Sequence, residues 1–200
     1  MNIVFVLFDN VTQLDFTGPV QFLSRLPGAD VYVVSTTGAA VTTDSGFSIV
    51  PRSSFKDCPQ ADIICVPGGH GVRDAIADAQ IVDFVRTQAS AAQYITSVCT
   101  GAFILGAANL LHGKEATCHW AYTHLLPMFG ATHRPARVVR DGNLVTAGGV
   151  RCKFSAARTK LSWRATSLKT RSCRKVAFFI AAAFGCVFGD ECHLFKAKSL

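Results

Sequence analysis

The turn at Cys99 constrains the fold of this chain more than any other feature. Residues 94–98 form a β-branched, apolar run that predicts a buried strand. Residues 100–111 predict a helix that ends at His112-Gly113. Almost no chain remains between the two, so we expect a sharp strand–turn–helix elbow at Cys99. The residues two positions before and after Cys99 are a serine and a glycine, which are small enough for such a turn.

An elbow of this kind projects its side chain into a crevice at the first turn of a helix. The helix terminus stabilises an anion by about 1 kcal/mol. This effect alone would lower the pKa of the Cys99 thiol from about 8.5 to about 7.8, so the helix terminus favours the thiolate but a second group is needed to activate it fully. The alternative is that Cys99 is a small buried core residue.

The first 150 residues alternate between strand-like and helix-like stretches, which predicts an α/β fold with a mostly parallel sheet. Strands are expected at residues 3–8, 30–35, 61–66, 94–98 and 115–118. Hairpins are expected at residues 40–50 and 137–147, and helices at residues 17–26, 78–92, 100–111 and 121–129.

Length and composition favour one compact domain without metal or membrane segments. The chain has 200 residues, of which 50% are hydrophobic. Its longest apolar run, residues 176–188, is too short to cross a bilayer, and residues 3–8 begin a strand without a signal-peptide pattern. We therefore expect a cytoplasmic protein. The eight cysteines contain no CxxC pair, which argues against a disulfide scaffold or a zinc site.

Charge divides the chain in two near residue 150. Residues 1–150 hold nine Lys and Arg against eleven Asp and Glu, whereas residues 151–200 hold eleven against two. We interpret residues 151–200 as a divergent basic tail produced by a change of reading frame or of splicing in the gene. The alternative is a natural basic extension that contacts acidic partners. No helix-turn-helix or RNA-binding signature accompanies the charge, so nucleic acid is not an expected partner.

Chemistry-bearing residues follow three of the expected parallel strands. Asp15 follows the first, Gly68-Gly69-His70-Gly71 follows the third, and Cys99-Thr100 forms the elbow. The carboxyl ends of such strands border the ligand crevices of open α/β sheets. Successive glycines let backbone amides approach an anion, so Gly68, Gly69 and His70 are candidate substrate-binding residues, although an ordinary turn is the alternative.

Asp15 has two interpretations. It lies just ahead of the helix expected at residues 17–26 and could be its N-terminal cap. If it instead meets Cys99, two negative charges would oppose each other. The consistent arrangement is then one shared proton, with the carboxyl group protonated and donating to sulfur.

Five motifs occur in the order that is typical of the PfpI-type superfamily, a branch of the class I glutamine amidotransferase-like fold. They are Leu-Asp-Phe-Thr-Gly-Pro around Asp15, Val-Pro-Gly-Gly-His-Gly at 66–71, Ser-Val-Cys-Thr-Gly-Ala at 97–102, Ala-Thr-Cys-His-Trp at 116–120, and Asp-Gly-Asn-Leu-Val-Thr-Ala-Gly-Gly at 141–149. The resemblance covers about residues 1–150. Within the superfamily the chain is most similar to isonitrile hydratases and to the amino-terminal domains of AraC-type regulators.

This resemblance implies a flavodoxin-like sandwich, a homodimer and no metal or organic cofactor. It also implies that Cys99 is the nucleophile, Asp15 its acid–base partner and Thr100 a further contributor. Protease-like members carry a histidine directly after the nucleophile, where this chain has Thr100, which argues against peptidase chemistry. His70 and His119 are alternative bases, although structural roles are commoner for histidine.

The leading functional hypothesis is an enzyme that adds water to an isonitrile to give an N-substituted formamide. A domain that senses a small molecule without turnover is the rival from another class, and cofactor-free conversion of reactive carbonyls such as methylglyoxal is a third hypothesis. Cys65 is expected in the core, and no function is assigned to Cys58 or Cys118.

Overall fold

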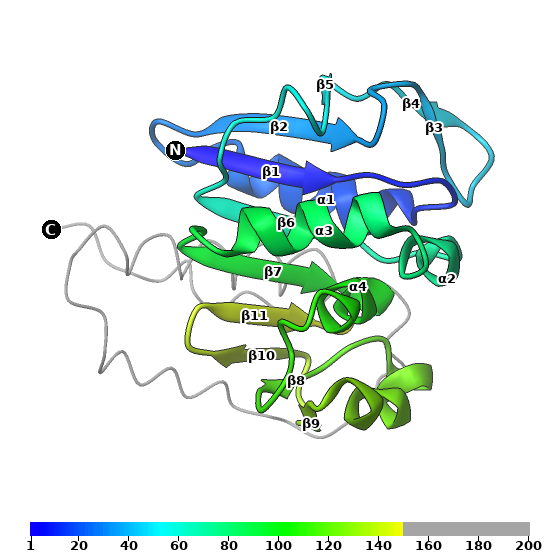
Figure 1. The fold of residues 1–200 in the computed structure, drawn as a ribbon, viewed down its shortest axis with the longest axis vertical. Coiled ribbons are helices and arrows are strands. Elements are labelled where there is room, and N and C mark those ends of the chain that lie inside the picture. The colour runs from blue at the N-terminus through cyan, green and yellow to red at the C-terminus, as the bar shows by residue number, and fades with distance from the viewer. Residues whose placement is uncertain (150–200) are drawn as a thin grey trace, which may run out of the picture.

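The computed structural model describes residues 1–149, which form a seven-stranded sheet with helices on both faces (Figure 1). Its strand order is β10-β11-β7-β6-β1-β2-β5, and all neighbouring strands are parallel except β10 and β11. The strands are β1 (Asn2–Val6), β2 (Asp30–Ser35), β5 (Ser53–Ser54), β6 (Ile63–Val66), β7 (Tyr94–Val98), β10 (Val138–Asp141) and β11 (Leu144–Ala147). The predicted flavodoxin-like, mostly parallel α/β fold is confirmed.

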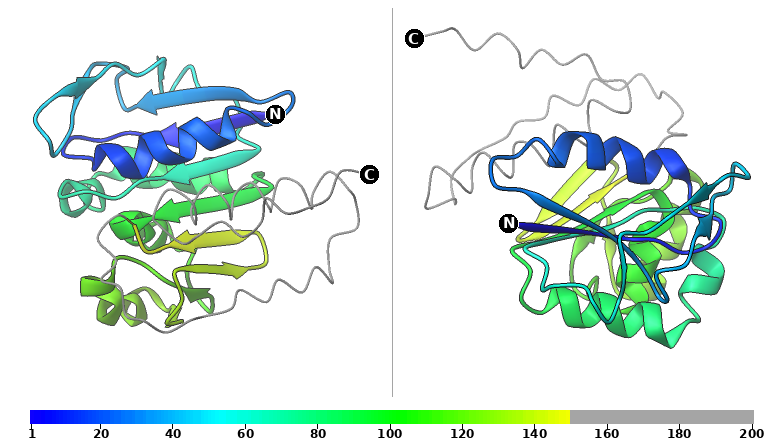
Figure 2. Two further views of the ribbon diagram at one scale, coloured as in Figure 1. Left: turned by 180° about the vertical axis from the view of Figure 1, so that it is seen from behind. Right: turned by 90° about the horizontal axis from the view of Figure 1, so that it is seen from above.

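Helices cover the two faces unequally. Helix α1 (Gln13–Leu23) lies on one face, and α2 (Val72–Ala75), α3 (Ala79–Ala89) and α4 (Ala102–Ala107) lie on the other (Figure 2). Two small sheets accompany the main one. Strands β3 (Val41–Thr42) and β4 (Ser48–Ile49) pair antiparallel, as the predicted hairpin requires, and β8 (Glu115–Ala116) pairs parallel with β9 (Thr132–His133).

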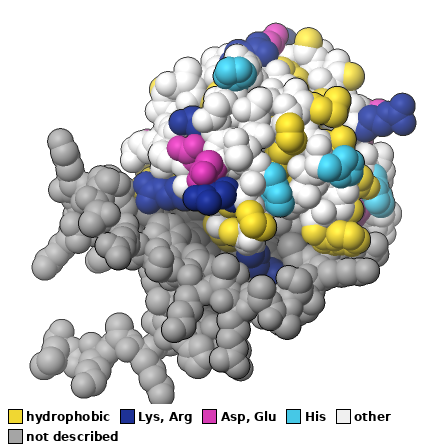
Figure 3. All heavy atoms as spheres, turned by 90° about the horizontal axis from the view of Figure 1, so that it is seen from below, with side chains coloured by type: hydrophobic (Ala, Val, Ile, Leu, Met, Phe, Trp, Pro, Cys, Tyr) yellow, Lys and Arg dark blue, Asp and Glu magenta, His cyan; other side chains and the backbone are white. Residues whose placement is uncertain are grey.

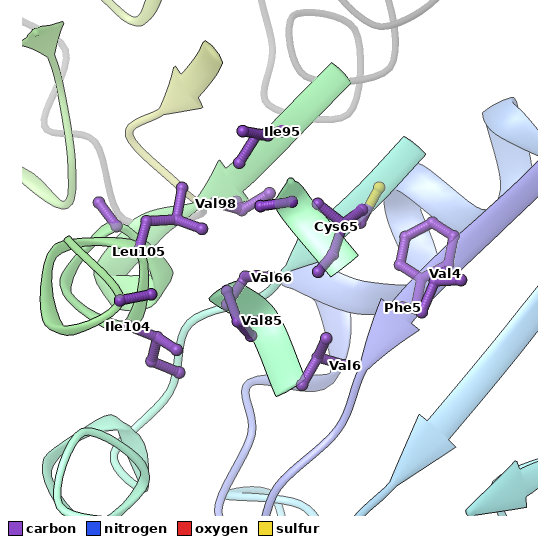
Figure 4. Close-up of a cluster of buried hydrophobic side chains, with 14 of the residues drawn as sticks. Val4, Phe5, Val6, Cys65, Val66, Val85, Ile95, Val98, Ile104 and Leu105 are labelled. Carbon is purple, nitrogen blue, oxygen red and sulfur yellow. The ribbon is translucent and has the colours of Figure 1, made fainter. Parts of the chain in front are cut away.

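The core lies between the central strands and the helices that pack on them. Figure 4 shows valines and isoleucines of β1, β6 and β7 next to Val85 of α3 and to Ile104 and Leu105 of α4. These side chains are almost fully buried, and Val85, Ile104 and Leu105 have no exposed surface at all. The continuous apolar character of the strands, rather than an alternating one, follows from burial on both faces.

Helix α1 begins earlier than predicted. The sequence suggested a start near Thr17 because proline is favoured in a first helical turn, but α1 begins at Gln13 and Pro19 lies inside it. A proline at this position cannot donate to the carbonyl of Asp15, four residues earlier. Asp15 therefore lies within the first turn of α1, and the prediction that it precedes the helix as its cap is wrong.

Several short elements also differ from the prediction. The helix expected at residues 100–111 is a 3₁₀ turn, η1 (Cys99–Gly101), followed by α4, which ends at Ala107; Asn109 then has a positive φ of 62°. The helix expected at residues 121–129 is the 3₁₀ helix η2 (Trp120–Phe129), which ends at Gly130 in the left-handed region. Strands β5 and β9 and helix α2 were not predicted, because two to four residues are too few to show a period.

The predicted boundary near residue 150, the basic tail at residues 151–200 and its interpretation as a change of reading frame lie outside the described residues. Within residues 1–149, no helix has the length and apolar character needed to span a membrane.

Candidate active site

The predicted elbow at Cys99 is present and strained. Strand β7 is buried along its whole length and ends one residue before Cys99, whose φ is +57°. A left-handed conformation costs a residue with a Cβ about 1–2 kcal/mol and persists where the surroundings enforce it. A Cβ on Gly101 would lie 2.6 Å from the carbonyl oxygen of Pro67, so a small residue is required there as predicted.

The loops that follow β1 and β6 are joined to each other beside this elbow. The amide of Thr12 donates to the carbonyl of Gly68 at 2.8 Å, and Val11 forms an antiparallel bridge with Gly69. Because β1, β6 and β7 are adjacent parallel strands, their carboxyl ends bring Asp15, Gly68 and Cys99 to one edge of the sheet. The structure therefore brings together the three predicted loops.

Asp15 is buried beside Cys99. Its side chain is 1% exposed in the first turn of α1, and it lies close enough to the Cys99 thiol to raise the pKa of that thiol. A buried carboxyl group beside a thiol is the arrangement in which one proton can be shared between two acids.

The electrostatics at Cys99 contradict the predicted activated thiolate. Burial raises the pKa of the Cys99 thiol far above its ordinary value, and the adjacent Asp15 carboxylate raises it further. The amide and the hydroxyl of Thr100 donate towards the sulfur and lower this pKa, but by less. The helix-terminus argument failed because about 1 kcal/mol from a dipole is smaller than the cost of desolvating a thiolate next to a carboxylate.

Thr100 links the elbow to the glycine loop. Its Oγ1 accepts a hydrogen bond from the Gly69 amide at 3.0 Å. Its single hydroxyl proton can be donated either to the Gly69 carbonyl oxygen, at 3.3 Å, or to the Cys99 sulfur. The Gly69 amide is therefore engaged with Thr100 and is not a free anion donor in this structure. Thr100 also places its own amide next to the sulfur.

The predicted substrate-binding residues have different environments. Gly68 is buried, and a Cβ on it would lie 2.7 Å from Cβ of Cys99 and 2.7 Å from the amide nitrogen of Thr100. Gly69 has a φ of +145°. The His70 side chain is exposed and forms no hydrogen bond with Cys99, Asp15 or Thr100 among the described residues. Glycine at 68 thus serves close packing against the nucleophile.

His119 supports the elbow through its backbone. Its amide donates to the carbonyl of Cys99 at 3.2 Å, and its Nδ1 accepts from the amide of Ala121 at 3.3 Å at the start of η2. The rings of Trp120 and Tyr122 each lie 5.5 Å from the His119 ring. Figure 3 views this end of the molecule, where η2 and β9 lie, and shows hydrophobic and histidine side chains on its surface.

Gly149 was overlooked in the search for site residues. It follows β11, is buried, and has a φ of +80°. A Cβ at this position would lie 3.0 Å from Sγ of Cys99. The sequence signals were a glycine pair after a strand, which is common in turns, and the place of Gly149 at the end of the motif at residues 141–149.

The other thiols of residues 1–149 have different surroundings. Burial raises the pKa of Cys65, inside β6, to about 12 and that of Cys58 to about 11. Cys118 is buried, with its Sγ 3.5 Å from the carbonyl of His119. The structure places Cys65 in the core, as predicted.

A cavity of about 420 Å³ lies elsewhere, over the carboxyl ends of β1 and β2. Its lining includes Asp9, Asp74 and Asp78 but neither Cys99 nor Asp15. Asp9 accepts from the amide of Thr42, and Asp78 accepts from the amide of Gln80, so both have structural roles. No cluster of residues suited to hold a metal ion is present in the described part of the chain. We therefore place the candidate active site at Cys99.

Comparison with known proteins identifies the family of this chain. The DJ-1/PfpI family matches residues 1–161. The isonitrile hydratase of Pseudomonas putida is 50% identical over 159 residues, which are 80% of this chain and 70% of that protein. The HTH-type transcriptional regulator GbdR of Pseudomonas aeruginosa is 30% identical over 125 residues, which are 60% of this chain and 34% of that protein.

Among solved structures, a ThiJ/PfpI family protein from Pseudomonas syringae superposes with a TM-score of 0.72 at 41% sequence identity. The match covers 74% of this chain and 62% of that protein. The seven-stranded, mostly parallel sheet and the elbow are thus accompanied by sequence similarity along most of the chain, and the chain belongs to the DJ-1/PfpI family.

Proposed function

We propose that this protein hydrates an isonitrile to an N-substituted formamide, with Cys99 as nucleophile. The observation that carries the proposal is the buried Asp15 carboxyl group, which lies close enough to the Cys99 thiol to raise its pKa. It is supported by the 50% identity to the isonitrile hydratase of Pseudomonas putida. The residue after the nucleophile is Thr100, so the histidine of protease-like family members is absent from this position.

The first step uses the single proton of the Asp15–Cys99 pair. The sulfur attacks the terminal carbon of the isonitrile, and the proton is transferred to the same carbon. A carbon–sulfur and a carbon–hydrogen bond form, which gives a thioimidate and leaves Asp15 ionised. The raised pKa of the thiol favours this order of events, because sulfur keeps its proton until the electrophile arrives.

The second step adds water. Ionised Asp15 accepts a proton from water as the oxygen attacks the thioimidate carbon, and the nitrogen gains the second proton. The carbon–sulfur bond then breaks, the formamide leaves, and one proton remains with the Asp15–Cys99 pair. The amide and the hydroxyl of Thr100, which donate towards the sulfur, stabilise the departing thiolate.

The direct test is turnover of cyclohexyl isocyanide by the purified protein, with N-cyclohexylformamide measured by chromatography. We expect formamide from the natural chain and none from Cys99→Ala. The matched control is Cys58→Ala, which removes a half-buried thiol whose Sγ lies 3.3 Å from the carbonyl oxygen of Pro59, and it should retain activity. Equal product from natural chain and Cys99→Ala contradicts the proposal.

The same samples test the two rival hypotheses. A sensing domain predicts thermal stabilisation by the isonitrile without formamide release, and the similarity to a transcriptional regulator is its support. Carbonyl conversion predicts lactate release from methylglyoxal. Either result without formamide would replace the hydratase proposal.

A further inference from the structure

We infer that Gly149 is a positioning residue for the nucleophile, because its missing side chain lets the backbone after β11 pack directly against Cys99. The inference rests on the proposed function and extends it to a residue outside the Asp15, Cys99 and Thr100 set. Its function is to hold the sulfur where Asp15 and Thr100 both reach it.

The contact is closer than any side chain permits. A Cβ on Gly149 would lie 2.5 Å from Cβ, 3.0 Å from Cα and 3.0 Å from Sγ of Cys99. Carbon atoms that are not bonded prefer separations of about 3.5–4.0 Å. A side chain at residue 149 would therefore overlap with the nucleophile itself rather than with a flexible neighbour.

A second glycine confines Cys99 from the neighbouring strand on its other side. Strand β7 lies between β11 and β6 in the sheet, and Gly68 follows β6. A Cβ on Gly68 would lie 2.7 Å from Cβ of Cys99. The backbones of two glycines, Gly68 and Gly149, thus border the Cys99 side chain. This confinement explains why Cys99 can persist at a φ of +57°.

Displacement of the sulfur would disturb its chemistry. The influence of Asp15 and Thr100 on the Cys99 thiol depends on the position of its sulfur. A misplacement of about 1 Å can cost roughly 100-fold in rate. A methyl group at residue 149 should therefore reduce turnover far more than substrate affinity, because the reacting group moves.

Gly142 provides a matched control for backbone strain. It lies in the turn between β10 and β11 with a φ of +65°, and a Cβ there would meet nothing within 4 Å. Gly142→Ala therefore introduces the strain of a positive φ without any steric overlap. Strain alone should lower Tm by a few degrees, about 2–4 °C for a chain of this size.

The experiment compares Gly149→Ala with Gly142→Ala in cyclohexyl isocyanide turnover. We expect kcat to fall about 100-fold for Gly149→Ala with a much smaller change in KM, and to stay within about twofold for Gly142→Ala. Iodoacetamide alkylation of Cys99, followed by peptide mapping, should also be slower in Gly149→Ala than in Gly142→Ala. Equal kcat and equal alkylation in the two variants would overturn the inference.

A double substitution keeps the test decisive if Gly149→Ala folds poorly. Cys99→Gly removes the side chain that the new methyl group would strike, and glycine accepts the positive φ. In the Cys99→Gly background, Gly149→Ala should lower Tm no more than Gly142→Ala does. If Gly149→Ala lowers Tm in the Cys99→Gly background as much as it does with Cys99 present, the inference is contradicted. Tm and alkylation need no isonitrile turnover, so this result is separable from a failure of the proposed function.

Discussion

Two cysteines on neighbouring strands differ in what surrounds them rather than in acidity. Cys65 lies inside β6, paired in register with Thr96 of β7, whereas Cys99 lies just beyond the end of β7. Burial raises the pKa of both thiols. Only Cys99 has a carboxyl group and a backbone amide directed at its sulfur. The comparison teaches that a strand end gathers groups from several loops, while a strand interior offers only its packed neighbours.

The largest expected difference between the two sites is in catalysis. Cys99→Ala should reduce isonitrile hydration by about 10⁴-fold or more, because the proposed nucleophile is removed. Cys65→Ala should leave kcat within about threefold and lower the free energy of unfolding by about 1 kcal/mol, through lost packing. Steady-state kinetics and urea unfolding of both variants measure this contrast. A comparable loss of kcat in Cys99→Ala and Cys65→Ala would contradict the expected difference between the two cysteines.

Asp15→Asn should separate catalysis from thiol reactivity. Hydration should fall by about 10²–10⁴-fold, because the general acid–base group is removed. Alkylation of Cys99 by iodoacetamide at pH 8 should instead become faster. The Asp15 carboxylate raises the pKa of the thiol, so its removal lowers that pKa and increases the thiolate fraction. Slower alkylation of Cys99 in this variant would show that the carboxylate does not oppose the thiolate.

The pH dependence of the natural chain follows from the same cause. Since the pKa of the Cys99 thiol is raised well above its ordinary value, only a small thiolate fraction exists near neutrality. Alkylation of Cys99 should therefore rise about tenfold for each pH unit between pH 7 and pH 9 without a plateau. Peptide mapping after timed labelling measures the rate. A plateau below pH 8 would support the activated thiolate that the isolated elbow suggested.

Thr100→Val should give the smallest change. It removes a hydroxyl that donates towards sulfur and accepts from the Gly69 amide, and a hydrogen bond of this kind is worth about 1 kcal/mol. We expect kcat to fall about fivefold and alkylation of Cys99 at pH 8 to slow, because a cause that lowers the thiol pKa is lost. Thr87→Val on helix α3, whose side chain is exposed, is the control.

The sequence predicted the long elements and the meeting of the three loops well. The β-branched run at residues 94–98 is β7 without a shift at either end, and the loops carrying Asp15, Gly68 and Cys99 meet as expected for adjacent parallel strands. Periodicity missed β5 and β9, which have two residues each. The start of α1 was misplaced because a local preference of proline was given more weight than the tertiary position of Asp15.

The amino-acid sequence by itself determined where the chain turns sharply and which residue occupies that turn. Both follow from short-range sterics, which small residues and β-branched runs reveal directly. Only the tertiary structure decided how the thiol ionises and which glycine touches it. Desolvation and the Asp15 carboxylate act through space from residues distant in sequence, and together they outweigh the helix terminus next to Cys99. For the same reason, the role of Gly149 became visible only once β11 was placed beside β7.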